Sequence, residues 1–273
     1  MSTCASLPDA SSSVLLCPHG PRLTPQSPLP VSPGSAWPSP LLDTRHPFTP
    51  SDAQRQLATF FDALFAAHGP QRWWPGRTRF EIIAGAILVQ NTAWTNAARA
   101  IANLRAASLL TPSAIEKVSP ARLARLIRPS GYFRQKARKL KAFARFLRES
   151  HRGSLARMFR TPTAQLREQL LQVHGIGPET ADSILLYAGN HPVFVVDAYT
   201  RRILLRHGLA HGKESYETVR GLFEQSLPND PRLFNEYHAL IVHTGKHHCR
   251  NRAPVCSTCA LRPFLPQPVE GSR

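Results

Sequence analysis

Residues 170–206 decide the fold: LLQVHGIGPETADSILLYAGNHPVFVVDAYTRRILLR. A helical pattern runs into Gly175, Ile176 and Gly177, and Pro178 then opens a second helix, where the fixed φ angle of proline is favourable. Two glycines flanking one apolar residue predict a tight turn, with the isoleucine side chain packed between the helices. The glycines also let a phosphate approach the backbone N–H groups at the second helix N-terminus. This hairpin predicts a contact with nucleic-acid backbone that reads no sequence.

The second helix is followed by an apolar segment, residues 192–196, and then by Asp197 at the start of the next helix. An aspartate at this place can cap the helix, because its carboxylate accepts hydrogen bonds from the first free backbone N–H groups. The segment 192–196 is the one strand-like run in the sequence, and helical patterns fill the rest from residue 51 onward. The sequence therefore predicts an all-α fold.

The chain is strongly basic, with 34 Lys and Arg residues against 17 Asp and Glu residues and a formal net charge of +17. So large an excess predicts a polyanionic partner, because fixed positive charge attracts phosphates over nanometre distances. The helix expected over residues 133–150 contributes a basic face. No run reaches the roughly 20 apolar residues of a membrane span. We expect a monomer that binds double-stranded DNA, without a membrane partner, in the cytoplasm near the nucleoid.

Composition divides the chain into a tail and a helical part. Residues 1–50 hold 11 of the 25 prolines, many serines and four charged residues that cancel. Such a segment offers no periodic apolar face to bury, so we expect a disordered tail. Beyond it we expect two helical lobes with a DNA-binding cleft. Residues 73–190 form a six-helix lobe with the hairpin, and residues 51–72 with 191–273 form the second lobe.

The hairpin, the loop after it and Asp197 resemble the signature of the endonuclease III superfamily of helix-hairpin-helix DNA glycosylases. The resemblance covers about residues 51–265. It implies an enzyme of base excision repair that flips a damaged base out of duplex DNA and cuts its N-glycosidic bond. Asp197 matches the catalytic aspartate of that superfamily. A carboxylate suits this role because bond cleavage builds positive charge on the sugar, and the same group can orient or deprotonate the attacking water.

Glu179 is an informative departure from the family pattern. Bifunctional members carry a lysine two residues after the second hairpin glycine, and that lysine forms a Schiff base with the sugar. A carboxylate cannot form an imine, so the resemblance implies a glycosylase without a lyase step. Two alternatives stay open: a bifunctional endonuclease III-type glycosylase and AP lyase acting on oxidised pyrimidines, and a non-catalytic DNA-damage-binding protein. Retention of Asp197, Gln90 and both hairpin glycines argues against the non-catalytic alternative.

Two residues match positions that insert into DNA. Gln90, at the end of a helix expected over residues 79–90, resembles the glutamine that fills the gap left by the flipped base. Filling this gap offsets part of the few kcal/mol of unstacking. Tyr132 falls on the matching loop for the opposite strand. The structural alternatives are a polar residue at a helix end for Gln90 and a lid on the core for Tyr132.

Trp73, Trp74, Pro75 and Trp94 flank the same helix. They resemble the superfamily branch that includes 3-methyladenine DNA glycosylase III, in which aromatic residues stack on an alkylated purine. A cationic base is attracted to an electron-rich ring face, which would discriminate it from a neutral base. We therefore expect an alkylated purine as substrate, with an oxidised pyrimidine second, although clustered aromatic residues also commonly form core.

Cys249, Cys256 and Cys259 match the C-x6-C-x2-C part of the superfamily's [4Fe-4S] loop. The fourth cysteine would stand six residues later, where this chain has Leu265. His247 or His248, the two residues that precede the first cysteine, could complete a Cys3His site that holds an iron–sulfur cluster or zinc. A degenerate loop without metal is the remaining alternative.

Overall fold

The computed structural model describes residues 52–266, so the tail expected over residues 1–50 lies outside the described part. Within residues 52–266 the chain is helical and contains no strand, as predicted. The apolar run 192–196, which has a strand-like pattern, is an extended loop. No helix in the described range is long and apolar enough to span a membrane.

The helices follow one another closely along the chain. Their bounds are α1 (Asp52–His68), α2 (Arg79–Leu88), α3 (Trp94–Ala106), α4 (Pro112–Lys117), α5 (Pro120–Leu126), α6 (Phe133–His151), α7 (Leu155–Met158), α8 (Thr163–Leu171), α9 (Pro178–Ser183), α10 (Ala198–Arg206), α11 (Tyr216–Ser226) and α12 (Pro231–His247). Short 3-10 turns η1 (Arg128–Ser130), η3 (Cys256–Thr258) and η4 (Arg262–Phe264) and a π-helical turn η2 (Ile184–Ala188) complete the secondary structure.

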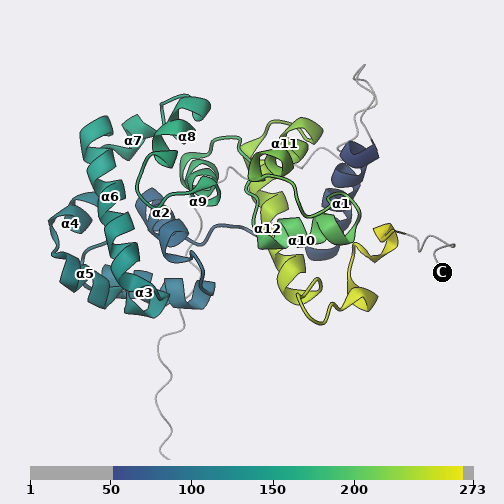
Figure 1. Cartoon of the computed structure of the whole chain (residues 1–273), viewed down its shortest axis with the longest axis horizontal. Coiled ribbons are helices and arrows are strands. Elements are labelled where there is room, and N and C mark those ends of the chain that lie inside the picture. The colour runs from purple at the N-terminus through teal and green to yellow at the C-terminus, as the bar shows by residue number, and fades with distance from the viewer. Residues whose placement is uncertain (1–51, 267–273) are drawn as a thin grey trace, which may run out of the picture.

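Figure 1 shows two groups of helices side by side, with α2 to α9 in one group and α1 with α10, α11 and α12 in the other. The first described helix, α1, packs against α11 and α12, which lie near the other end of the chain. The first group contains eight α-helices rather than the expected six. The difference arises from helices such as α4 and α7, which have 6 and 4 residues and are too short to show a helical period in sequence.

Each group is built around one largely buried helix. All residues of α2 from Phe80 to Leu88 are buried, and Thr78 caps this helix by accepting a hydrogen bond from the backbone N–H of Glu81. In the second group α12 buries most of its length after a cap at Asp230 and a proline at the next position. The π-helical turn η2 packs against both α2 and α12 and so joins the two groups.

The segment expected to form a single helix over residues 178–188 changes its winding. It runs as α9 to Ser183 and continues as the π-helical turn η2. A π-helical turn rotates the side chains that follow it relative to the preceding helix. Tyr187 in η2 is thereby buried where the two helix groups meet.

Candidate active site

The hairpin between α8 and α9 has the geometry that its sequence predicts. Ile176 is buried, as expected for a side chain that packs between the two helices. Gly175 has a φ of +80°, and a methyl group there would overlap the Lys139 side chain, so this position requires glycine. Gly177 begins α9 with open space around its Cα atom. The hairpin backbone at Gly177 is therefore accessible to a large ligand.

Gln90 is held on this hairpin. The helix expected to end at Gln90 ends at Leu88, because the chain turns there. The Gln90 side-chain amide donates hydrogen bonds to the Gly175 carbonyl oxygen (3.2 Å) and to the Thr180 hydroxyl (2.8 Å), and its oxygen accepts one from the Lys139 ammonium group. Gln90 is therefore more than a polar residue at a helix end, since it joins α2, α6 and the hairpin.

Tyr132 and Gln90 line the same polar cavity. The cavity has a volume of about 240 Å3, and its lining residues are Gln90, Asn91, Tyr132, Gln135, Lys136 and Lys139. Tyr132 is 66% exposed and has a left-handed φ of +43° at the start of α6. This exposure rules out a role as a lid on the core. Insertion of Gln90 and Tyr132 into DNA stays a prediction, and their placement in the lining of one cavity is compatible with it.

Lys136 fixes the two sides of this cavity relative to each other. Its side chain is buried, and its ammonium group donates hydrogen bonds to the carbonyl oxygens of Leu88 (3.0 Å) and Ser130 (2.5 Å). Burial and the nearby charge of Lys139 lower the pKa of Lys136 to about 8. This amine therefore ties the end of α2, next to Gln90, to the loop that carries Tyr132.

Asp197 caps the N-terminus of α10. Helix capping is the structural role that the sequence allows for this residue. Its Oδ1 atom accepts hydrogen bonds from the Thr200 backbone N–H (2.8 Å) and the Thr200 hydroxyl (3.0 Å). Its Oδ2 atom lies 3.6 Å from Nε2 of His238. The cap uses one carboxylate oxygen, so the other oxygen is available for chemistry. The cap and a catalytic role are thus compatible in one side chain.

His238 and Tyr187 form a buried pair behind Asp197 that the sequence analysis missed. The Tyr187 hydroxyl lies 2.6 Å from His238 Nδ1. Burial raises the pKa of Tyr187 well above its usual value, and the Asp197 charge adds to this, so the phenol stays protonated and can serve as a hydrogen-bond donor to Nδ1. Burial lowers the pKa of His238, although Asp197 opposes this. A neutral ring that accepts at Nδ1 carries its proton on Nε2, toward Asp197.

Glu179, the residue in place of the family lysine, lies in the first turn of α9 near Asp197. Its side chain is exposed at the surface, although nearby protein atoms partly desolvate its carboxyl group. This desolvation and the Asp197 charge raise the pKa of Glu179 to about 7, while Arg201 opposes the shift. Near neutral pH the site therefore combines the Asp197 carboxylate with a partly protonated Glu179.

The three expected tryptophans form one aromatic cluster centred on Trp74. Its ring centroid lies 5.3 Å from Trp73, 5.1 Å from Trp94 and 5.0 Å from Tyr187. A methyl group on Gly85 would press against Trp74 and Trp94, so this glycine makes room for both rings. The three tryptophans are half-buried. Pro75, the other residue expected in the pocket, is exposed beside them.

This cluster is continuous with the carboxylate site. Trp74 packs on Tyr187 with an interplanar angle of 33°, and Tyr187 reaches His238 and hence Asp197. The Trp74 indole N–H is buried without a hydrogen-bond partner in the described residues. A buried donor of this kind usually finds a partner, which a bound molecule can supply. A role of these tryptophans in binding a base stays a prediction.

The three cysteines of the C-terminal loop line one cavity together with Leu265. Leucine supplies no ligand at the fourth position, and the cavity of about 20 Å3 has room for about one water molecule. The short bonds of zinc require ligand atoms that lie close together. Within residues 52–266 these cysteines belong to no group of three ligand atoms that all lie within 4.8 Å of one another. Leu265 therefore prevents a four-cysteine [4Fe-4S] site, and the spacing of the three thiols does not match a zinc site, although His248 lines the same cavity.

The chain matches known proteins over most of the described residues. The family described as "HhH-GPD superfamily base excision DNA repair protein" matches residues 84–229. A Methanocaldococcus jannaschii protein, provisionally named a DNA repair glycosylase, is 44% identical over 75% of this chain and 93% of its own length. Endonuclease III of Thermotoga maritima is 30% identical over 67% of this chain and 80% of its own length.

Solved structures agree with these sequence matches. The Helicobacter pylori 3-methyladenine DNA glycosylase MagIII, bound to 1,N6-ethenoadenine, superposes with a TM-score of 0.62 at 28% identity, covering 72% of this chain and 98% of its own. An endonuclease III trapped in a covalent intermediate with DNA superposes with a TM-score of 0.65 at 21% identity, covering 78% of this chain and 95% of its own. This second likeness concerns the fold alone.

Proposed function

Since this chain belongs to the HhH-GPD superfamily of base excision DNA repair proteins, and is thus a DNA glycosylase, we propose that it excises alkylated purines by hydrolysis alone. The observation that carries the proposal is the pairing of Asp197 with Glu179. The family lysine position lies near the candidate catalytic carboxylate, close enough for the Asp197 charge to raise the pKa of Glu179, and it holds a carboxyl group that cannot form an imine. Hydrolysis by this site leaves an intact abasic site in the DNA.

DNA binding in this proposal begins at the hairpin. The open backbone at Gly177 lets a phosphate approach α9, and the basic residues of α6 add attraction for the DNA backbone. Gln90 and Tyr132 line the same polar cavity, from which they would enter the two strands at the damaged base pair. The hydrogen bonds of Gln90 to the hairpin hold this residue in place before DNA arrives, which reduces the ordering needed on binding.

Asp197 is the group that we propose acts on the sugar. As the bond between the base and C1′ lengthens, positive charge develops on the sugar ring, and a fixed carboxylate next to it stabilises that transition state. The same carboxylate takes the proton of the attacking water. Nε2 of His238 lies 3.6 Å from Oδ2, and a proton on this nitrogen would orient the carboxylate.

The aromatic cluster supports an alkylated purine as the substrate. Trp73, Trp74 and Trp94 present half-buried rings that lead to Asp197 through Tyr187. A base such as 3-methyladenine carries positive charge, so it gains cation–π attraction that a normal base lacks. Among the similar structures, the MagIII enzyme at 28% identity is a 3-methyladenine DNA glycosylase, and it is bound to 1,N6-ethenoadenine. Oxidised pyrimidines are neutral, so they would gain less binding energy from the same rings.

Single-turnover excision on two matched duplexes tests this proposal. One duplex carries 3-methyladenine and the other carries thymine glycol, and each reaction is analysed with and without hot alkali. We expect base loss from the alkylated duplex, with strand breaks after alkali only. Strand breaks on thymine glycol without alkali would contradict both the substrate and the hydrolytic mechanism, and would identify a bifunctional enzyme in which another amine replaces the lysine.

A further inference from the structure

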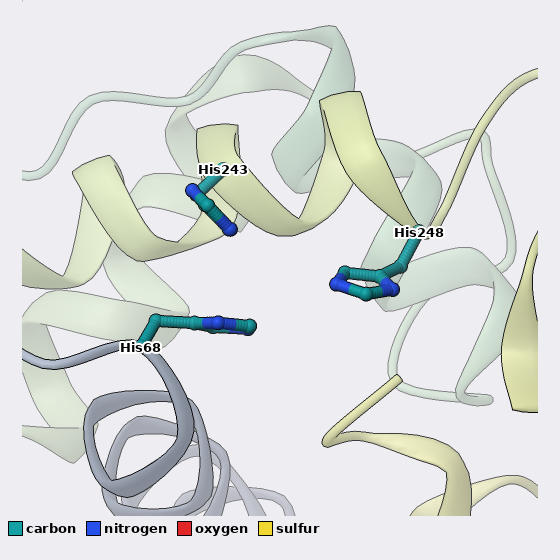
Figure 2. A group of neighbouring side chains, drawn as sticks. All are labelled: His68, His243 and His248. Atoms are coloured by element: carbon teal, nitrogen blue, oxygen red, sulfur yellow. The ribbon is translucent and has the colours of Figure 1, made fainter. Parts of the chain in front are cut away.

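A cluster of three histidines lies outside the candidate active site. His68 ends α1, His243 lies in the last turns of α12, and His248 directly follows that helix. One ring nitrogen of each lies within 4.8 Å of the others. Figure 2 shows the three rings gathered around a common space between the two segments. Residues separated by about 175 positions in sequence thus present the same ligand type to one point.

Hydrogen bonding does not account for this cluster. The Nε2 atom of His68 is buried, and it has no hydrogen-bond partner in residues 52–266. Buried ring nitrogens normally have a partner, because a buried polar atom without a hydrogen bond destabilises the fold. The His68 ring centroid lies 4.5 Å from that of His243 and 5.7 Å from that of His248, so the neighbours of this nitrogen are other imidazoles. A shared cation would satisfy such nitrogens together.

We propose that His68, His243 and His248 bind one divalent transition-metal ion of the zinc type. Neutral imidazole is a preferred ligand of zinc, with Zn–N distances of about 2.0–2.1 Å. Tetrahedral bonds of that length place ligand nitrogens about 3.4 Å apart. Side chains whose nitrogens lie within 4.8 Å of one another reach this spacing by small rotations. Water or His247, whose ring lies 4.6 Å from that of His243, takes the fourth position.

The position of the site gives the metal a structural role. It joins the end of α1 to the end of α12, at the point where the cysteine loop begins. His248 also lines the cysteine cavity, in which Leu265 prevents a four-thiolate cluster. Lys246 lies over the Trp73 ring at 5.6 Å, so the same region contacts the aromatic cluster. The ion would clamp the C-terminal loop to α1 through imidazoles rather than thiolates.

Metal titration of the full chain tests the proposal. The chain is first freed of metal with a chelator and then titrated with Zn2+ by calorimetry and with Co2+ by absorption spectroscopy. We expect one equivalent of zinc, a rise in Tm on loading, and a cobalt spectrum without the near-ultraviolet charge-transfer band that thiolate ligands produce. Failure to bind one equivalent of zinc, or a cobalt spectrum dominated by thiolate charge transfer, would overturn the site.

Variants separate the histidine cluster from the cysteine loop. His243→Gln should weaken zinc binding at least tenfold, while the double variant Cys256→Ser, Cys259→Ser should bind like the parent. His211→Gln, which alters an exposed histidine away from the cluster, is the matched control. Loss of zinc in the cysteine variant together with retention in His243→Gln would assign the metal to the loop and refute the proposal. The wild-type cobalt spectrum decides the case if a variant does not fold.

Discussion

Nε2 of His238, a buried residue of α12, lies 3.6 Å from Oδ2 of Asp197 at the start of α10. The other Asp197 oxygen caps α10, so the carboxylate is oriented from both sides. His238 is itself oriented by the Tyr187 hydroxyl at 2.6 Å. In the proposed mechanism His238 and Tyr187 are positioning residues, since they would act on the sugar only through Asp197.

Tyr187→Phe tests this positioning role. The variant keeps the ring that packs on Trp74 but removes the hydrogen bond to His238, so the proton of the neutral ring is no longer fixed on Nε2. We expect single-turnover excision to slow by about tenfold, as for loss of one orienting hydrogen bond of about 1.4 kcal/mol. The matched control is Tyr237→Phe, which removes a buried hydrogen bond to the Leu57 carbonyl. Equal slowing by both variants would contradict the role.

Glu179→Gln should change how stability depends on pH. In the folded chain the pKa of Glu179 is raised to about 7 from 4.5, so the folded state holds more protons between these values. The free energy of unfolding therefore loses this contribution as pH rises from 4.5 to 7. We expect the Tm of the variant, relative to wild type, to be higher at pH 8 than at pH 5. With Glu149→Gln, on the exposed side of α6, as control, a pH-independent Tm difference would contradict the shifted pKa.

Glu179→Lys should introduce lyase activity. An amine at this position lies near Asp197 and can attack C1′ to form a Schiff base, provided that it loses its proton. We expect strand breaks without alkali and a covalent DNA adduct after borohydride reduction. Glu168→Lys makes the same charge change on an exposed face of α8 and should give neither product. Absence of the adduct in Glu179→Lys would show that the sugar does not reach this position.

Lys136→Met should damage both stability and excision. Removing the amine leaves the buried carbonyls of Leu88 and Ser130 without this donor, which costs about 1–3 kcal/mol for each unsatisfied group. It also loosens the two loops that carry Gln90 and Tyr132. We therefore expect a lower Tm and a slower excision rate.

Lys141→Met is the matched control for that experiment. Lys141 lies on the same helix, and its ammonium group also donates to two carbonyl oxygens, at the α4 end. We expect this control to lower Tm while excision stays near the wild-type rate. A normal rate for Lys136→Met, measured below its Tm, would show that the amine does not position the cavity.

The features that could be predicted from sequence each depend on residues that lie close together along the chain. The all-α fold follows from helical periodicity, and the hairpin follows from the left-handed φ that Gly175 must adopt. Asp197 could be placed at a helix start because its capping partner, Thr200, is three residues away. In each case a short stretch of sequence contains the whole physical cause.

The features that sequence did not reveal depend on distant contacts. His238 is 41 positions from Asp197, and nothing around it marks it as different from a core histidine. Tyr187, which contacts this ring, lies in the π-helical turn η2. This turn packs between α2 and α12, which are distant from it in sequence. The grouping of His68 with His243 likewise depends on how α1 packs on α12. The order of residues along the chain carries no direct signal for such pairs.

Single-turnover excision by Asp197→Asn, with DNA affinity and Tm measured in parallel, is the most direct test that this carboxylate does the chemistry. The asparagine oxygen can still accept the capping hydrogen bond from Thr200, so folding and DNA binding should change little. We expect the excision rate to fall by about 10²–10³-fold, because the stabilising negative charge is lost. Asp230→Asn, at the cap of α12, is the matched control and should cut normally. Excision by Asp197→Asn at the wild-type rate would contradict the assignment of Asp197 as the catalytic residue.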